Sequence, residues 1–274
     1  MKKLPIFPDL KNKNVIITGG HGFLGKQHAE ALMKNNANVI ILDIVDNKKF
    51  KKHIKNQNTN YLFFKCDITN KKNLIKVKNT LIKKKLKIDI LINNASINYP
   101  PNRYKIKDLK LETFNNNFWV KDISIGLTGA LFTTQIFGKE MCKNKSGVII
   151  NVASDLGIIA PNQNIYKNKL NKQFFIKPVS YSVVKHGIIG LTKYTSTYWS
   201  KYNIRCNSIS PGGMESTERR KSNNKIKSKI SKLIPLGRMS KYGEYQASIL
   251  YLASEASSYM TGNNLVVDGG RSIW

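Results

Sequence analysis

The sequence predicts an α/β fold in which a doubly wound, mainly parallel seven-stranded sheet is covered by helices on both faces. Short β-branched runs alternate with helical segments roughly every 25 to 35 residues, the length of a β-α-β unit. The runs are apolar along their whole length, as in strands that are buried on both sides. No Pro-, Gly- or Ser-rich linker divides residues 1–274, so we expect one domain.

The expected elements follow one another in a regular order. The seven strands are expected at residues 15–18, 38–43, 61–66, 88–93, 148–152, 204–210 and 265–268. Helical patterns fill most of the intervals, and three long irregular stretches remain, at 97–107, 158–178 and 214–232. Each stretch follows the carboxyl end of a strand. Open α/β sheets bind their ligands at that edge, so we expect the functional site there.

The chain is strongly basic, with 46 Lys and Arg against 16 Asp and Glu and a formal net charge of +30. Only six of the basic residues are Arg, and the lysines are spread along the whole chain. Proteins that read nucleic acids favour Arg for bidentate contacts and aromatic residues for stacking. We therefore expect solvated surface lysines and no specific nucleic-acid partner.

Several classes of protein are excluded by the apolar and cysteine patterns. The longest apolar runs, such as 39–42 and 148–150, are too short to cross a membrane. The first residues contain no apolar stretch of signal-peptide length, which favours a cytoplasmic protein without a membrane partner. Cys66, Cys142 and Cys206 are odd in number and widely spaced, so we expect neither a disulfide framework nor a metal site.

A glycine-rich loop between the first strand and the first helix carries the first chemical signal. Gly19, Gly22 and Gly25 stand in G-x-x-G-x-x-G spacing. Glycines in this position allow a tight turn and a close approach of the backbone to a pyrophosphate, and the helix N-terminus favours the negative charge. The loop predicts a dinucleotide site, whose other loop residues are His21, Phe23 and Leu24.

An acidic residue at the end of the second strand refines this prediction. Asp43 lies 18 residues after Gly25, where a carboxylate can accept hydrogen bonds from an adenosine ribose. A 2′-phosphate would be repelled by Asp43, which favours NAD over NADP, although His21 and Lys26 lie near the loop. The structural alternative is that Asp43 only caps the next helix.

A Tyr-x-x-x-Lys pair is the second signal. With 12 tyrosines and 40 lysines in 274 residues, about two such pairs are expected by chance, and two are found. Tyr61 and Lys65 fall on an expected strand, where residues four apart do not meet. Tyr181 and Lys185 begin a helical pattern that runs to about Tyr202, so they share one face a turn apart. We therefore assign the function to the second pair.

In this order the motifs resemble those of the short-chain dehydrogenase/reductase family, over roughly residues 12–271. The resemblance also rests on Cys66-Asp67-Ile68-Thr69, Asn93-Asn94-Ala95-Ser96, Asn151-Val152-Ala153-Ser154, Pro211-Gly212-Gly213, Thr261-Gly262 and Val267-Asp268-Gly269-Gly270. It implies a Rossmann domain and an NAD(P)-dependent oxidoreductase acting on a CH–OH or C=O group. It also implies cofactor contacts by Asp67, Ile68, Asn94, Ala95, Ser96, Tyr181, Lys185, Pro211 and Gly212.

The resemblance implies a catalytic role for three side chains. Tyr181 is the expected general acid and base, although an unperturbed tyrosine with a pKa near 10 is a poor base at neutral pH. A nearby Lys185 ammonium would favour the phenolate and lower that pKa. Lys185 would also bind the nicotinamide ribose, and Ser154 would orient the substrate oxygen. The structural alternatives are a core tyrosine, a solvated lysine and a serine at a strand end.

The sequence departs from the family at one position of the proton relay. The family usually has an Asn in a stretch like Asn-Leu-x-Gly in the helix before the fifth strand. Aligning Leu127-Thr128-Gly129 with that stretch puts Gly126 in its place. A relay through this site must then use water, the backbone or another side chain. The same departure is the best argument for the alternative of a non-catalytic, dinucleotide-binding sensor.

The segment between Ser154 and Tyr181 is about twice the family's usual length. We expect this insertion, at about 158–178, to lie over the substrate, with polar groups that suit a sugar and lysines that suit a phosphate or carboxylate: Asn162, Gln163, Asn164, Tyr166, Lys167, Lys169 and Lys172. The neutral alternatives are a solvated loop or a subunit contact.

The substrate and the assembly are also predicted from the resemblance. The motifs around Ser154, the insertion, 177–181 and 210–213 look like those of oxidoreductases for bacterial surface sugars and flagellin glycans. This predicts carbohydrate biosynthesis, with a sugar, sugar phosphate or nucleotide sugar as substrate. The alternative substrate is a 3-oxoacyl thioester. Family members usually form tetramers, so we expect a homotetramer or a dimer.

Overall fold

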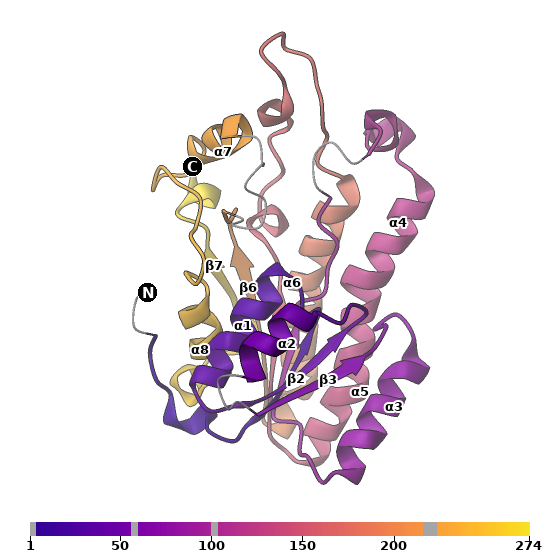
Figure 1. Ribbon diagram of the computed structural model, residues 1–274, viewed down its shortest axis with the longest axis vertical. Coiled ribbons are helices and arrows are strands. Elements are labelled where there is room, and N and C mark those ends of the chain that lie inside the picture. Colours follow the sequence, from indigo (N-terminus) through magenta and orange to yellow (C-terminus); the bar gives the residue numbers. More distant parts are fainter. Residues whose placement is uncertain (1–3, 56–59, 100–103, 216–223) are drawn as a thin grey trace.

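The computed structural model describes residues 4–55, 60–99, 104–215 and 224–274. Its centre is a seven-stranded parallel sheet with the order β3-β2-β1-β4-β5-β6-β7 (Figure 1). The strands are β1 Asn14–Thr18, β2 Asn38–Asp43, β3 Tyr61–Lys65, β4 Ile90–Asn93, β5 Gly147–Val152, β6 Ile204–Pro211 and β7 Asn264–Val267. The predicted fold class is confirmed, and each predicted strand boundary lies within two residues of the observed one.

Helices cover both faces of the sheet. They are α1 Phe23–Lys34, α2 Lys48–Lys55, α3 Lys71–Lys83, α4 Asn116–Ile123, α5 Gly129–Lys143, α6 Val179–Trp199, α7 Asn224–Ser231 and α8 Gln246–Ala253. Within β1, Val15 and Ile17 pack into the core shared with α1, α2 and α8, whereas Ile16 packs into the core shared with α3 and α5. Alternate residues of a strand point to opposite faces, so an entirely apolar strand is buried from both sides.

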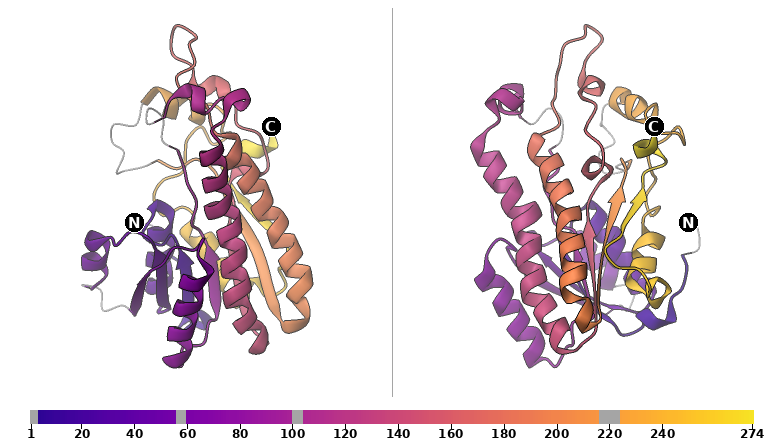
Figure 2. Two further views of the ribbon diagram at one scale, coloured as in Figure 1. Left: turned by 90° about the vertical axis from the view of Figure 1, so that its right-hand side faces the viewer. Right: turned by 180° about the vertical axis from the view of Figure 1, so that it is seen from behind.

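α4 and α5 are joined by a π-helical turn, Ser124–Thr128, and form one long rod beside α6 (Figure 2). Ala130 of α5 packs with Val184 and Ile188 of α6 in a separate small core. This pairing matters for the site because α6 also carries Tyr181 and Lys185.

The strand order reverses between β1 and β4. β1 is followed by β2 on one side of the sheet and β4 is followed by β5 on the other, so the chain leaves the carboxyl ends of β1 and β4 in opposite directions. A crevice opens outside the strand ends at such a switch point, and it is the usual ligand site of open α/β sheets. The loops after β1, β4, β5 and β6 surround it here.

The predicted insertion rises above this crevice as a long loop at the top of Figure 1. It is closed by an antiparallel bridge between Lys167 and Gln173. An apolar cluster lies at its base, formed by Tyr99, Leu109, Ile165, Tyr166 and Phe175 with partly buried side chains around them.

The prediction that 214–232 is irregular is wrong in its last part. α7 covers Asn224–Ser231, and residues 216–223 lie outside the described ranges. Ile226 and Ile230 stand four residues apart and pack against the apolar cluster at the base of the insertion. The helix therefore forms where one apolar face meets the insertion, a contact distant in sequence.

Candidate active site

The glycine loop folds back tightly between β1 and α1. The Gly19 N–H donates to Leu42 O at 2.8 Å, and the Gly22 N–H donates to Gly19 O at 3.0 Å. Gly19 has φ +61, and a Cβ there would lie 2.9 Å from Ala95 Cα. A Cβ on Gly25 would overlap the Gly19 carbonyl oxygen. The backbone can therefore follow this path only with glycines, and the first turn of α1 faces the crevice with no side chain at Gly22 to cap it.

The segment after β4 holds the glycine loop in place. The Asn94 side-chain amide donates to Thr18 O and to Gly19 O, both at 3.0 Å. In return, Thr18 Oγ1 accepts the N–H groups of Asn94 and Ala95, at 3.0 and 3.1 Å. This reciprocal bonding fixes the loop against the strand end and leaves Ser96 at the wall of the crevice.

Asp43 at the end of β2 is oriented toward the loop. Its Oδ2 accepts the His21 N–H at 3.0 Å, and its Oδ1 accepts the Val45 N–H at 3.0 Å. Asn47 caps the first turn of α2 by accepting the Phe50 N–H, so Asp43 does not serve as that helix cap. A carboxylate retains further acceptor sites, and Asp43 lines the crevice, where a ribose hydroxyl could donate to it.

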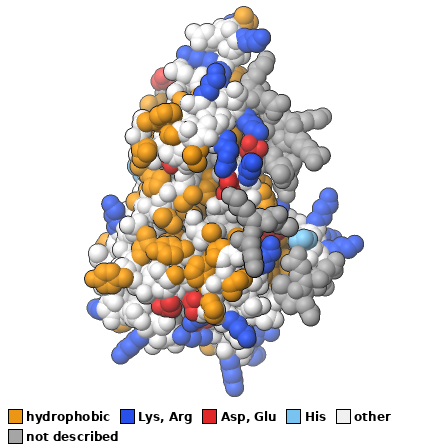
Figure 3. All heavy atoms as spheres, turned by 90° about the vertical axis from the view of Figure 1, so that its left-hand side faces the viewer, with side chains coloured by type: hydrophobic (Ala, Val, Ile, Leu, Met, Phe, Trp, Pro, Cys, Tyr) orange, Lys and Arg blue, Asp and Glu red, His pale blue; other side chains and the backbone are white. Residues whose placement is uncertain are grey.

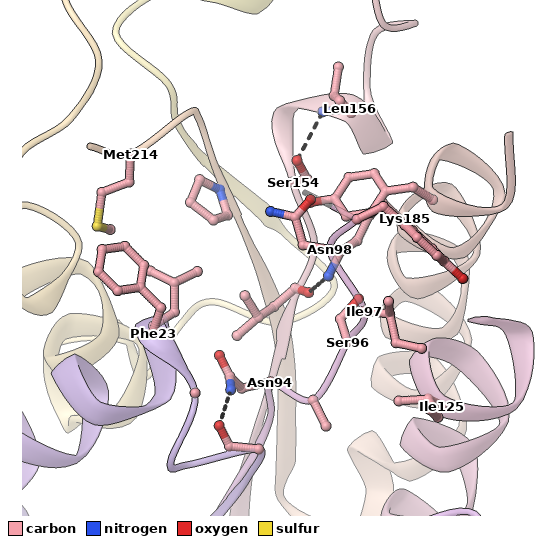
Figure 4. Close-up of a pocket in the computed structure, with 18 of the residues that line it drawn as sticks. Phe23, Asn94, Ser96, Ile97, Asn98, Ile125, Ser154, Leu156, Lys185 and Met214 are labelled. Carbon is pink, nitrogen blue, oxygen red and sulfur yellow. Dashed lines mark hydrogen bonds between the residues drawn. The ribbon is translucent and has the colours of Figure 1, made fainter. Parts of the chain in front are cut away.

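The crevice is a large cleft of about 1870 Å³ along the carboxyl edge of the sheet. Every predicted site residue lines it except Gly25, which lies behind the loop: Gly19, His21, Gly22, Phe23, Leu24, Asp43, Asp67, Ile68, Asn94, Ala95, Ser96, Ser154, Tyr181, Lys185, Pro211 and Gly212. In Figure 4, Phe23 and Met214 lie on one side of the cleft, and Ser154, Asn98 and Lys185 lie on the other. The shape and lining fit an extended dinucleotide, with its pyrophosphate at the glycine loop.

Ser154, Tyr181 and Lys185 meet at one end of this cleft. Ser154 follows β5, and the other two lie one turn apart on α6. The Ser154 hydroxyl lies close enough to the Tyr181 hydroxyl to influence its pKa. The Lys185 Nζ donates to Val152 O at 2.8 Å and lies 5.7 Å from the centre of the Tyr181 ring. The cluster has the composition that proton transfer at an alcohol oxygen needs.

The pKa of Tyr181 differs from the expectation. Burial raises the pKa of Tyr181 to about 12, while the nearby Ser154 hydroxyl, which can donate to a phenolate, acts in the opposite direction. Burial lowers the pKa of Lys185 to about 8. The net shift of the tyrosine pKa is thus opposite to the lowering that we expected from Lys185. Desolvation penalises both charged forms, so a phenolate here requires additional positive charge at the site.

Asp155 and Arg271 form a buried ion pair beside Ser154. The Arg271 guanidinium donates to Asp155 Oδ2 at 2.7 Å, and both side chains are more than nine-tenths buried. Asp155 Oδ1 accepts from the Ser154 hydroxyl at 2.8 Å and from the Leu156 N–H at 2.8 Å. A hydroxyl has one proton, so Ser154 can donate it either to Asp155 or to an oxygen in the cleft, but not to both at once.

Gly126 packs directly against α6, the helix that carries Tyr181 and Lys185. It lies in the π-helical turn, and a Cβ at this position would be 2.5 Å from Val184 Cγ1. The relay Asn of the family therefore does not fit here without moving Val184. The Lys185 ammonium donates instead to the backbone carbonyl of Val152, one of the substitutes that the sequence left open.

Gly126→Ala is expected to destabilise the protein by about 1–3 kcal/mol, because the added methyl group overpacks a buried contact with a stiff, β-branched side chain. The free energy of unfolding in urea measures this. In a Val184→Ala background the same substitution should cost clearly less, because the colliding methyl groups are gone. An equal cost in both backgrounds would contradict the proposed collision.

The predicted roles of the insertion residues are only partly right. Asn162, Asn164, Lys169 and Lys172 are exposed, and Gln163 and Lys167 do not line the cleft. Of the predicted set only Tyr166 lines it, together with Pro161, Ile165, Phe175 and Lys177 from the same segment. Long ammonium side chains on a projecting loop stay in water, since burial would cost their solvation without a partner.

Sequence reasoning missed four polar residues that line the cleft together with Ser154, Tyr181 and Lys185: Asn98, Asp155, Lys177 and Arg271. Asp155 could have been suspected because it follows Ser154 directly. The other three come from the loop after β4, the end of the insertion and the C-terminal segment. No spacing in the sequence brings them together.

The chain is similar to known oxidoreductases along nearly its whole length. A family model described as enoyl-(acyl carrier protein) reductase matches residues 22–272. An NAD-dependent glycerol dehydrogenase from Listeria innocua is 32% identical over 267 residues, which cover 97% of this chain and 96% of that protein. A 3-oxoacyl-(acyl-carrier-protein) reductase from Thermotoga maritima is 30% identical over 267 residues, with 96% and 99% covered.

A solved crystal structure has a similar fold over most of its length. The short chain dehydrogenase from Leptospira borgpetersenii with bound NAD+ superimposes with a TM-score of 0.83 at 28% identity, covering 96% of this chain and 94% of that one. The fold and the cleft define an oxidoreductase that acts on alcohol or carbonyl groups with a nicotinamide dinucleotide. The chain belongs to the short-chain dehydrogenase/reductase family.

Proposed function

We propose that this protein transfers a hydride between a nicotinamide dinucleotide and a carbon of a small, polyhydroxylated substrate that interconverts between CH–OH and C=O. One observation carries the proposal: Ser154, Tyr181 and Lys185 converge beside a cleft whose opposite side is the glycine loop. The bound nicotinamide would supply the hydride chemistry. The protein supplies proton transfer and orientation of the substrate.

The roles of the three side chains follow from their contacts. In the oxidation direction the Tyr181 Oη takes the proton of the substrate hydroxyl, and in the reduction direction it gives that proton back to the carbonyl oxygen. Lys185, held by Val152 O, places a positive charge near the ring and favours the phenolate once the site is filled. Ser154 holds the substrate oxygen within reach of Tyr181.

The polar end of the cleft favours a sugar-like substrate. Asn98, Lys177, Asp155 and Arg271 line the cleft near Ser154 and Tyr181 and give this end a polar and charged wall, which suits a sugar-type substrate better than an apolar one. The Listeria relative is named for glycerol, which is the same chemical type. The resemblance of the sequence motifs to surface-sugar and flagellin-glycan oxidoreductases favours a substrate of carbohydrate biosynthesis. That narrower assignment stays a prediction.

A second function, the reduction of a 3-oxoacyl thioester, is favoured by the apolar rim of the cleft. Met214, Ile226, Ile230 and Met239 line it and could contact an acyl chain. The Thermotoga relative is named for this reaction. Nicotinamide absorbance distinguishes the two functions with a panel of polyols, sugar acids, sugar phosphates, nucleotide sugars and 3-oxoacyl thioesters. Turnover of thioesters alone would overturn the first proposal.

Asp43→Ala is expected to lower the preference for NAD over NADP by about 10- to 100-fold, measured as the ratio of kcat/KM values. The carboxylate would accept hydrogen bonds from the ribose of NAD and repel a 2′-phosphate, and both effects are lost with it. Asp46→Ala is the matched control, because Asp46 lies three residues away, pairs with Lys51 and does not line the cleft. An unchanged ratio in Asp43→Ala would refute the assignment.

We also propose that the protein acts as a homotetramer in the cytoplasm. Exposed apolar side chains gather on the side that carries α8 and β7, including Tyr259, Val266 and Trp274 (Figure 3). A second set lies on α4 and α6, including Val120 and Tyr194. Two separate self-complementary faces would support a tetramer, whereas one would support a dimer. Among the described residues, no helix is long and apolar enough to span a membrane.

A further inference from the structure

Lys177 is an unusual residue for the wall of this cleft. The residue is only 8% exposed, although it carries an ammonium group and lines the cleft beside Tyr181. The Nζ sits 3.6 Å above the centre of the Tyr181 ring. Placing a charged group there is costly unless a partner compensates for the lost water.

The backbone around Lys177 is held so that the side chain must enter the cleft. The Lys177 N–H donates to Gln163 Oε1 at 2.9 Å, and Gln163 Nε2 donates back to Lys177 O at 3.0 Å. Gln173 in turn donates to Gln163 O at 2.9 Å. These hydrogen bonds join the two sides of the insertion just before α6 begins. They hold the backbone of Lys177 in place.

Within the described residues, Lys177 Nζ has a single hydrogen-bond acceptor, Asn98 Oδ1 at 2.8 Å. An ammonium has three donors, so two remain for a ligand. Because Asn98 uses its oxygen to accept from Lys177, its side-chain NH₂ group is left as a donor next to the ammonium. Two neighbouring donors match the two oxygens of a carboxylate.

The charged groups around Lys177 also favour the binding of an anion beside it. The groups that face it are Asp155, Lys185, Asp122 and Arg271, with the Tyr181 ring below. Asp155 forms an ion pair with Arg271, and Asp122 accepts hydrogen bonds from Tyr99 and Ser180. Burial lowers the pKa of Lys177 to about 7, and an anionic ligand would restore its charge.

We propose that Lys177, together with Asn98, binds a carboxylate that the substrate carries close to its reacting hydroxyl. This inference rests on the proposed function and narrows its substrate class to hydroxy acids of the sugar type. Lys177 determines specificity and does not itself transfer the proton. A neutral polyol would leave the ammonium without its partner, so the acid is the better substrate.

Matched pairs of an acid and an alcohol with the same carbon chain test the proposal: D-gluconate with D-glucitol, and glycerate with glycerol. Lys177→Met is expected to lower kcat/KM for the acids by about 10- to 100-fold and for the alcohols by less than about threefold, because only the acids lose a charge-assisted contact. Lys177→Arg should retain much of the preference. Lys172→Met removes an exposed lysine of the same insertion and should change neither value.

The pH profile gives a second readout. Below the pKa of Lys177 the ammonium binds the acid, and above it the neutral amine does not. Hence kcat/KM for the acids should fall as the pH rises above about 7 relative to kcat/KM for the alcohols, and Lys177→Met should abolish this difference. Equal losses for acids and alcohols in Lys177→Met would overturn the proposal and indicate that the residue acts through the Tyr181 ring.

Calorimetry separates a failure of this inference from a failure of the proposed function. Acids do not react with the reduced cofactor, so their binding to the protein loaded with NADH can be measured without turnover. Lys177-dependent binding of an acid, with no oxidation of any member of the panel, would keep the inference and overturn the function. Turnover of alcohols with no binding of any acid would overturn the inference alone. Circular dichroism and NADH affinity confirm that each variant is folded.

Discussion

Tyr181→Phe is expected to lower kcat by about 10²- to 10⁴-fold, because it removes the hydroxyl that exchanges a proton with the substrate oxygen. The aromatic ring remains, so its contacts with Lys177 and Lys185 are kept. The affinity for the dinucleotide should therefore change little. Absorbance of the reduced nicotinamide measures turnover, and protein fluorescence measures cofactor binding.

The appropriate control lies on the same helix. Tyr194 is exposed on α6 and does not line the cleft, so Tyr194→Phe removes a similar hydroxyl without touching the site. Full activity in Tyr181→Phe would eliminate the proposed mechanism. Tight cofactor binding by the wild type without turnover of any substrate would favour the alternative of a dinucleotide sensor.

The pH dependence of the rates of oxidation and reduction follows from the Tyr181 hydroxyl. Burial raises the pKa of Tyr181 to about 12, so at neutral pH the phenol is almost wholly protonated. Oxidation needs the phenolate as base and should become faster as the pH rises. Reduction needs the neutral phenol as acid and should not gain from a higher pH. The Phe variant should lose the pH dependence of oxidation over this range.

The fold could be predicted because its signals are local. An apolar run such as 148–152 is buried on both faces wherever it lies in a parallel sheet, and the glycines at 19 and 25 allow a backbone path in which a side chain would collide with the loop. The pair Tyr181 and Lys185 needed only one turn of helix to meet. Each of these features depends on residues within a single strand, loop or helix.

The rest of the site depends on contacts between distant segments. Arg271 reaches Asp155 over 116 positions, and Lys177 reaches Asn98 over 79. The sequence offered several lysines in the insertion, and which one enters the cleft is decided by the Gln163 side chain pairing with the backbone of Lys177. The π-helical turn at Gly126 likewise has no sequence pattern of its own, and arises where α4 and α5 pack on Val184.

Arg271→Met is expected to destabilise the protein by about 3–5 kcal/mol, the largest effect on stability among the substitutions considered. It leaves the buried Asp155 carboxylate with neutral donors only, the Ser154 hydroxyl and the Leu156 N–H. Breaking a buried ion pair from one side costs more than the pair contributes, since the remaining charge stays desolvated. Urea denaturation measures the loss.

The double variant Asp155→Asn with Arg271→Met decides between a charge effect and a packing effect. The Asn side-chain oxygen can still accept the Leu156 N–H, and no charge is left buried, so most of the lost stability should return. If the double variant is as unstable as Arg271→Met, the loss comes from the packing of the arginine stem. Arg238→Met is the surface control: its pair with Glu244 is exposed, so its loss should be small. Asp155→Asn also weakens the competition for the Ser154 proton, which leaves that hydroxyl freer to donate to a substrate oxygen.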